Sequence, residues 1–191
     1  MRPPVPAPKS NPQLTLRPQD LVVLLRLSLD AGPAPSYAAL AAELGMTASE
    51  VHAAVERAVA ARLASKDAAG RPAVVREALR RFVQFGAPYC FPATRGSLTR
   101  GLPTGYAAAP LNRTILPGTD PVPAWPYKHG TVRGATLHPL YPSVPAAAQR
   151  NPALYELLAL FDAVRGGSVR ERALALELLD ARITGTAVDA G

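Results

Sequence analysis

The chain of 191 residues carries a net charge of +7, and much of its 48% hydrophobic content is alanine, with aromatic residues at only 6%. This length allows one mid-sized domain or two small ones. The single cysteine, Cys90, excludes an intramolecular disulfide and a cysteine-rich zinc site, and its apolar neighbours predict a buried side chain.

The two ends of the chain carry no membrane signal. Residues 1–13 contain prolines where a signal peptide needs an apolar run, and no stretch approaches the length of a membrane span. We expect flexible tails at 1–13 and 185–191, a cytoplasmic location and no membrane partner.

Three helices are predicted in the first part of the chain. The first, LRPQDLVVLLRLSLDAG, has a proline near its first turn and a glycine after its end. A second helix follows Ser36 and stops at Gly45, and a third spans 47–63. The third begins with a capping box, because Thr47 and Glu50 have the spacing at which each side chain reaches the other's free backbone amide.

The rest of the chain is less regular until its C-terminal part. The stretch from Ala64 to Val74 has a Gly-Arg-Pro turn and predicts either a short hairpin or a loop before the next helix. A Pro- and Gly-rich segment follows at 87–149, with short strands expected, for example at 131–142. Residues 150–184 predict two amphipathic helices joined by two glycines, an αα-hairpin. This hairpin either supplies dimer contacts or packs on its own domain.

Positive charge is concentrated in the middle of the chain. Residues 57–133 contain twelve lysines and arginines against three acids, so the remaining residues have a small negative balance. A basic middle between near-neutral flanks is typical of a protein that binds a polyanion. An ordinary basic surface of a soluble protein explains the same charges equally well.

The residues ELGMTASEV join the second and third predicted helices. Ala41 is small where the next helix crosses, Gly45 permits a left-handed turn, and Val51 is expected to be buried between the helices. This spacing is typical of a helix-turn-helix, whose second helix enters the major groove of DNA. Helical pairs in plain bundles share the pattern.

Residues 17–85 resemble bacterial winged-helix regulators of the MarR-like kind. A leading helix, the stretch SYAALAAELGMTASEVHAAVERAVAARL, the possible hairpin and a further helix follow one another in that order. Residues 87–183 resemble an uncharacterised bacterial group that joins such a domain to a Pro-rich segment and a helical tail. The resemblance implies a mainly α fold with a small β component, built from a winged helix-turn-helix domain at 14–86, an irregular Pro-rich segment and a C-terminal αα-hairpin.

The resemblance places the base-reading surface on the exposed side of the third predicted helix. Short polar side chains near the start of such a helix can approach base edges, and its N-terminal amides favour phosphate. Cationic side chains at the hairpin are natural contacts to phosphate or to the minor groove. The predicted DNA-binding residues are Thr47, Ser49, His52, Glu56 and Arg57 on the helix, and Lys66 and Arg71 at the hairpin.

The stretch TRGSLTRGLPTGY, residues 94–106, contains Thr-Arg-Gly twice. Glycine lets the backbone approach a DNA strand closely, and each guanidinium can bind a phosphate through two hydrogen bonds. We therefore expect Arg95 and Arg100 to contact DNA. The alternative is a segment packed across the domain, whose arginines cap helix C-termini or pair with Glu156 and Asp162.

Catalysis, cofactors and metal binding are not expected. The sequence has no P-loop, no nucleophile elbow and no clustered carboxylate pair, and its three histidines lie on dissimilar segments. We predict a homodimeric bacterial transcriptional regulator that binds double-stranded DNA sequence-specifically. One alternative is a protein-interaction module, such as an antitoxin or adaptor subunit of a two-gene system. Another is a small-ligand sensor with a pocket between Trp125, Tyr127 and Tyr141.

Overall fold

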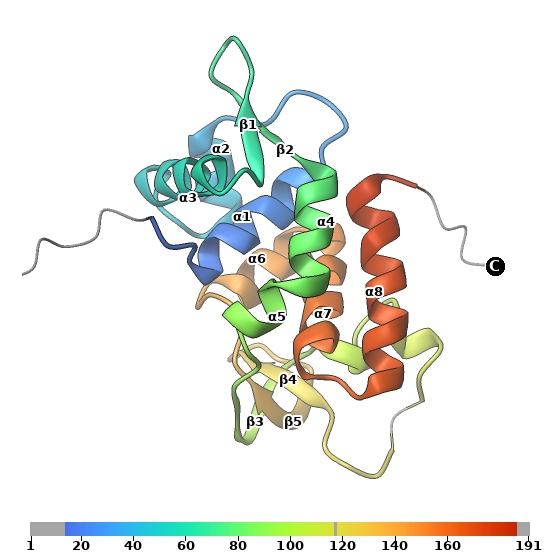
Figure 1. Cartoon of the computed structure of the whole chain (residues 1–191). Helices are drawn as coiled ribbons and strands as arrows, with labels where there is room; N and C mark the ends of the chain where they lie inside the picture. Colours follow the sequence, from blue (N-terminus) through green and yellow to red (C-terminus); the bar gives the residue numbers. More distant parts are fainter. Residues whose placement is uncertain (1–13, 117, 187–191) are drawn as a thin grey trace, which may run out of the picture.

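The computed structural model describes residues 14–116 and 118–186, which form a helical body with two small sheets (Figure 1). The chain is of mixed α and β structure, and helices predominate among the described residues. The predicted tail at 1–13 and most of the one at 185–191 lie outside the described residues. No helix in the described part is long and apolar enough to cross a membrane.

Three short helices open the described chain, and their ends follow the predicted caps. These helices are α1 (Pro18–Ser28), α2 (Tyr37–Leu44) and α3 (Ala48–Ala60). The hydroxyl of Ser36 accepts the Ala39 amide at the start of α2, and α2 ends at Gly45 with a φ of 66°. Thr47 and Glu50 form the predicted capping box at the start of α3. Because each cap satisfies amides that the helix leaves free, the helix starts are fixed locally.

A two-stranded hairpin follows α3. The strands β1 (Ala64–Lys66) and β2 (Pro72–Val74) pair antiparallel, with Ala64 opposite Val74. Of the two predicted alternatives for this stretch, the hairpin is therefore the one that forms. It is followed by α4 (Arg76–Phe85) and by the single-turn α5 (Ala87–Cys90).

The Pro- and Gly-rich segment contains a three-stranded closed sheet. Its strands are β3 (Arg95–Pro103), β4 (Pro123–Pro126) and β5 (Val132–Leu137), and the short 3-10 turns η1 (Gly105–Ala107) and η2 (Leu111–Arg113) lie between β3 and β4. β3 pairs antiparallel with both other strands, which pair parallel with each other. Glycine is required where the backbones meet, because a Cβ at Gly101 would lie 2.0 Å from the Trp125 carbonyl oxygen.

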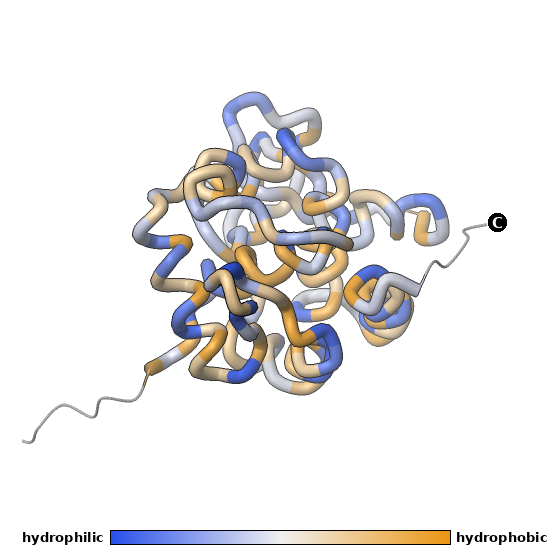
Figure 2. The backbone as a smooth tube through the Cα atoms, turned by 90° about the horizontal axis from the view of Figure 1, so that it is seen from above, coloured by the Kyte–Doolittle hydropathy of each residue, from blue (hydrophilic) through white to orange (hydrophobic). Residues whose placement is uncertain are grey.

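The last three helices pack against helices from the first part of the described chain. They are α6 (Val144–Arg150), α7 (Pro152–Gly166) and α8 (Val169–Thr184). The predicted αα-hairpin is present as α7 and α8, and its apolar sides face the same chain: α7 contacts α1, while α8 contacts α4. One cluster of buried side chains therefore runs from α1 through α3 to α7 and α8. Along the helices, hydrophobic and hydrophilic residues alternate (Figure 2), as expected where each helix turns one side to a core.

Candidate nucleic-acid interface

The outward side of α3 carries three exposed polar residues near the start of the helix. Thr47, Ser49 and His52 are exposed, whereas Val51 and Val55 on the opposite side are buried. The His52 ring packs edge-on against the Tyr37 ring at the start of α2, with 5.3 Å between the ring centres. The exposed side of α3 therefore continues onto the start of α2.

The turn between α2 and α3 is braced by the segment that leads into α6. The Ser143 hydroxyl donates to the Leu44 carbonyl oxygen at 2.6 Å. The Tyr141 hydroxyl donates to a carboxylate oxygen of Glu50 at 2.8 Å. A Cβ at Gly45 would lie 3.1 Å from the Ser143 side chain, so this turn needs glycine both for its left-handed φ and for space. These contacts fix α3 relative to α2 and leave its first polar positions uncovered.

The hairpin is tied to α3 by an ion pair. The Lys66 ammonium contacts the Glu56 carboxylate, and His52 Nε2 lies 3.4 Å from the same carboxylate. The hydrogen bond between Lys66 and Glu56 lowers the pKa of Glu56 and raises the pKa of Lys66. Two predicted DNA contacts therefore neutralise each other in the free protein.

The tip of the hairpin is also internally paired. Asp67 accepts hydrogen bonds from the backbone amides of Ala69 and Arg71, and from Arg71 Nε at 2.9 Å. These bonds, with the Arg71 amide first, lower the pKa of Asp67. Arg71 remains exposed beside its partner, so its guanidinium keeps unused donors for a phosphate.

Arg57 does not belong to the exposed side, which corrects its predicted role. Its guanidinium makes two hydrogen bonds to the Asp20 carboxylate of α1, at 2.7 and 2.8 Å. The Arg57 side chain is 12% exposed and that of Asp20 is 1% exposed. Arg57 therefore holds α3 on α1 and is not free to bind DNA. The acid lies 37 residues earlier, and no local sequence pattern indicates this pairing.

Arg95 and Arg100 lie away from α3, and their contact with DNA stays a prediction. They belong to β3, and the strands β3, β4 and β5 lie at the opposite end of the molecule from α2, α3 and the hairpin (Figure 1). Arg95 donates to the Gly166 carbonyl oxygen at 2.6 Å and so caps the end of α7, as in the predicted alternative. The acids of that alternative have other partners, because Glu156 pairs with Arg182 and Asp162 with Arg165.

Two further cations were not identified from the sequence. Arg62 is exposed just after α3 with a left-handed φ of 61°, in a Schellman arrangement where glycine is usual. Arg133 on β5 lies directly opposite Arg100 on β3. No local sequence pattern indicates a positive φ at Arg62. The position of Arg133 opposite Arg100 depends on the register of β3 and β5, which the sequence does not define.

The proposed ligand pocket between three aromatic residues is not formed. Trp125 is buried against Tyr155, Tyr127 packs against His129, and Tyr141 bonds to the start of α3. The Cys90 side chain is exposed rather than buried, because it lies at the end of the single-turn α5.

Other parts of the described structure have structural roles. The Asp162 carboxylate accepts hydrogen bonds from Thr104, Trp125 and Arg165, and its burial raises its pKa. This network joins the closed sheet to α7.

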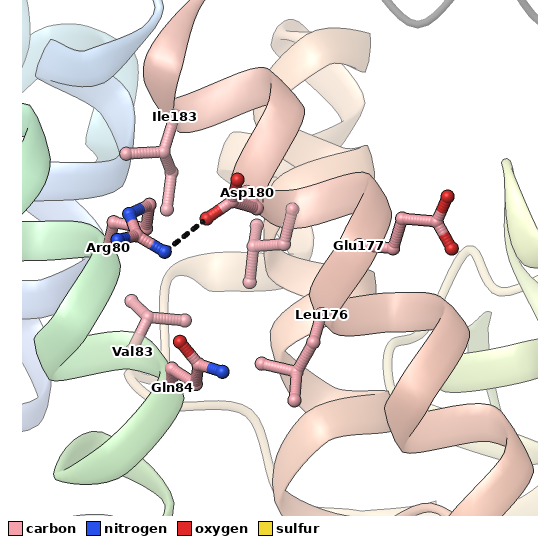
Figure 3. A pocket seen from close by; sticks show the side chains of 8 residues that line it. Arg80, Val83, Gln84, Leu176, Glu177, Asp180 and Ile183 are labelled. Atoms are coloured by element: carbon pink, nitrogen blue, oxygen red, sulfur yellow. Dashed lines mark hydrogen bonds and ion pairs between the residues drawn. The ribbon is translucent and has the colours of Figure 1, made fainter.

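A groove between α4 and α8 is crossed by an ion pair of 3.1 Å between Arg80 and Asp180 (Figure 3). The described residues hold no cluster of three or more potential metal ligands.

No family model, curated protein or solved structure matches this chain. The functional proposal below therefore rests on the contacts and exposures of the described residues.

Proposed function

We propose that the protein is a sequence-specific double-stranded DNA-binding regulator, in which α1 to α4 and the β1–β2 hairpin form a winged helix-turn-helix. In this proposal α3 enters the major groove and the hairpin lies along the adjacent backbone. The cytoplasmic location predicted from the sequence belongs to the same proposal.

The observation that carries the proposal is the uncovered polar start of α3. Thr47, Ser49 and His52 are exposed while the turn before them is braced from behind by Ser143. A helix of 13 residues is roughly 20 Å long at 1.5 Å per residue, and its width suits the major groove. The Ser49 hydroxyl and the His52 ring are short enough to reach base edges without a long, flexible linker. The Thr47 hydroxyl is bonded to Glu50 in the capping box, so Thr47 would contribute to the helix start rather than to base reading.

The hairpin would contact the DNA backbone when its two cations exchange their carboxylate partners for phosphates. Lys66 and Arg71 are paired with Glu56 and Asp67 in the free protein. All four side chains lie at or near the surface, where an ion pair contributes little, so phosphate can replace the carboxylates as partner. DNA binding should therefore weaken steeply as salt concentration rises.

The homodimer remains a prediction, and two exposed aromatic side chains favour a different interface from the C-terminal hairpin. α7 is buried within its own chain, whereas Phe85 is 68% exposed and Tyr89 is 81% exposed near the junction of α4 and α5. We place the dimer contact at these two aromatic side chains, because such exposed aromatics are common anchors in protein interfaces.

Selection from a pool of duplexes with 20 random base pairs tests the proposal. We expect enrichment of an inverted repeat, because a dimer presents two reading helices related by a two-fold axis. A pool that stays random after repeated rounds contradicts sequence-specific binding.

The second candidate is a protein-interaction module. The observation that favours it is the same pair of exposed aromatic side chains, Phe85 and Tyr89, together with the exposed Leu14. A chain that is monomeric by sedimentation, binds no duplex and co-purifies with a partner encoded beside it would favour this candidate.

A further inference from the structure

Two arginines face each other across the strands β3 and β5. Arg100 and Arg133 are direct partners in the antiparallel register, so both side chains stand on the same side of the sheet. Both are exposed. Like charges directly opposite each other are destabilising, so this arrangement is unfavourable unless an anion lies between them.

A further cation lies near this pair of arginines, and no acid is paired with any of the three side chains in the described structure. Lys128 is exposed on the turn that begins at Tyr127, and Arg100 Nε donates to the Gly130 carbonyl oxygen of the same turn at 2.9 Å. Among the ion pairs of the described residues, none involves Arg100, Lys128 or Arg133. We call these three residues the β3–β5 basic face.

The chemistry of this face suits a phosphodiester backbone. The Nε of Arg100 is used within the protein, and this bond orients the guanidinium while leaving its terminal amino groups available. Arg100 and Arg133 are opposite residues of two paired strands, so their guanidinium groups can bind one phosphate from its two sides, each with two hydrogen bonds. Thr131, which precedes β5, is exposed and small, so it leaves room for a sugar–phosphate strand beside the two arginines. Such phosphate contacts carry no sequence information.

The position of the face separates it from α3. The closed sheet lies at the far end of the molecule from the hairpin and α3 (Figure 1). His52 of α3 packs against Tyr37 of α2, and Glu56 pairs with Lys66 of the hairpin, so the exposed side of α3 turns toward the hairpin end. The β3–β5 basic face and the exposed side of α3 therefore lie toward opposite ends of the molecule.

We infer that the β3–β5 basic face binds the backbone of a second duplex DNA segment, independently of sequence. This inference deepens the proposed function, because a regulator that reads one site through α3 would hold another segment of DNA at its opposite end. It also accounts for the local excess of positive charge that α3 and the hairpin do not use.

The test is a salt titration with a fluorescent 30-base-pair duplex of arbitrary sequence, measured by anisotropy. The starting protein is the full chain with Ser49→Ala and His52→Ala, which removes the proposed reading contacts. Each phosphate contact contributes roughly 0.9 to the slope of log affinity against log salt. The further changes Arg100→Gln and Arg133→Gln should reduce the slope by about 2 and the affinity at low salt by at least tenfold.

Matched variants make the result specific. Arg170→Gln with Arg172→Gln removes the same charge from exposed positions on α8 and should leave the slope nearly unchanged. Arg133→Gln alone should reduce the slope by about 1, and it removes no hydrogen bond or ion pair that the described residues form. Thermal melting confirms that each variant is folded.

Three outcomes would overturn the inference: an unchanged slope in the Arg100 and Arg133 variant, an equal loss in the Arg170 and Arg172 control, or tighter binding of a 30-nucleotide single strand than of the duplex. The result is independent of the proposed function. The protein could enrich no sequence from the random pool and still show a reduced salt slope only when Arg100 and Arg133 are changed. That result would support the β3–β5 basic face and contradict base reading by α3.

Discussion

Arg57 stabilises the fold by neutralising a carboxylate that is almost fully buried. Its two hydrogen bonds to Asp20 join α3 to α1, and the bond to Asp20 raises the pKa of the Arg57 guanidinium. Asp20 also accepts the backbone amide of Arg17, so it is held at the start of α1 whether or not Arg57 is present.

We predict that Arg57→Met destabilises the protein by about 3 kcal/mol, because it leaves the buried Asp20 carboxylate without a partner of opposite charge. Urea unfolding followed by circular dichroism measures this change. Arg71→Met, at an exposed ion pair, is the matched control and should leave the urea midpoint almost unchanged. Equal midpoints for the wild type and Arg57→Met would show that the pair contributes no net stability.

At the scale of elements, α4 carries a surface network in which one acid is paired with two arginines. Glu77 accepts hydrogen bonds from Arg80 and Arg81, and these bonds lower the pKa of Glu77 to about 2. Arg80 also reaches Asp180 on α8, as the dashed line in Figure 3 shows. The network therefore extends from one helix to the next.

We predict that Glu77→Gln lowers the melting temperature at neutral pH and that the difference from the wild type vanishes in acid. The pKa of Glu77 is depressed in the folded state, so its contribution is present above the ordinary value of 4.5 and is lost as pH falls toward 2. Melting curves between pH 7 and pH 2 measure the trend. Glu177→Gln is the control, because this side chain points away from Arg80 (Figure 3). A difference that persists unchanged at pH 2 would contradict the assignment.

The elements most accurately predicted from the sequence are those that local chemistry defines. Ser36 and Thr47 each cap a helix through a neighbour three residues away, and the pairing of Thr47 with Glu50 is visible in the sequence. Gly45 ends α2 in the predicted left-handed conformation. The closed sheet could not be predicted in the same way, because its pairing joins β3 to a strand about thirty residues later and passes through close backbone contacts at Gly101 and Gly134.

The candidate site was only partly predictable for the same reason. The exposure of Ser49 and His52 follows from helical spacing, because they lie on the side away from Val51 and Val55. The roles of Arg57 and Arg100 depend on partners distant in the sequence. The charge distribution along the sequence could not show that Lys66 and Arg71 lie at one end of the molecule and that Arg100 and Arg133 lie at the other.

On the scale of the whole molecule, oligomeric state follows from which apolar side chains the chain leaves exposed. We predict a dimer that Phe85→Ser with Tyr89→Ser converts to a monomer, because these variants remove the exposed aromatic anchors near α5. Analytical ultracentrifugation measures the mass. Val169→Ser, at an exposed position on the C-terminal hairpin, should leave the dimer intact. A dimer that is lost with Val169→Ser and kept with Phe85→Ser and Tyr89→Ser would place the interface on the C-terminal hairpin.

The proposed function requires that the uncovered start of α3 reads base sequence. Fluorescence anisotropy with the selected duplex and with a scrambled duplex of the same composition tests this directly. We expect Ser49→Ala with His52→Ala to weaken binding of the selected duplex by at least tenfold and to remove the preference over the scrambled one, because each good base contact contributes about 1–3 kcal/mol. His138→Ala, an exposed histidine away from α3, should change neither value. A preference for the selected duplex that survives the Ser49 and His52 changes intact would contradict the account.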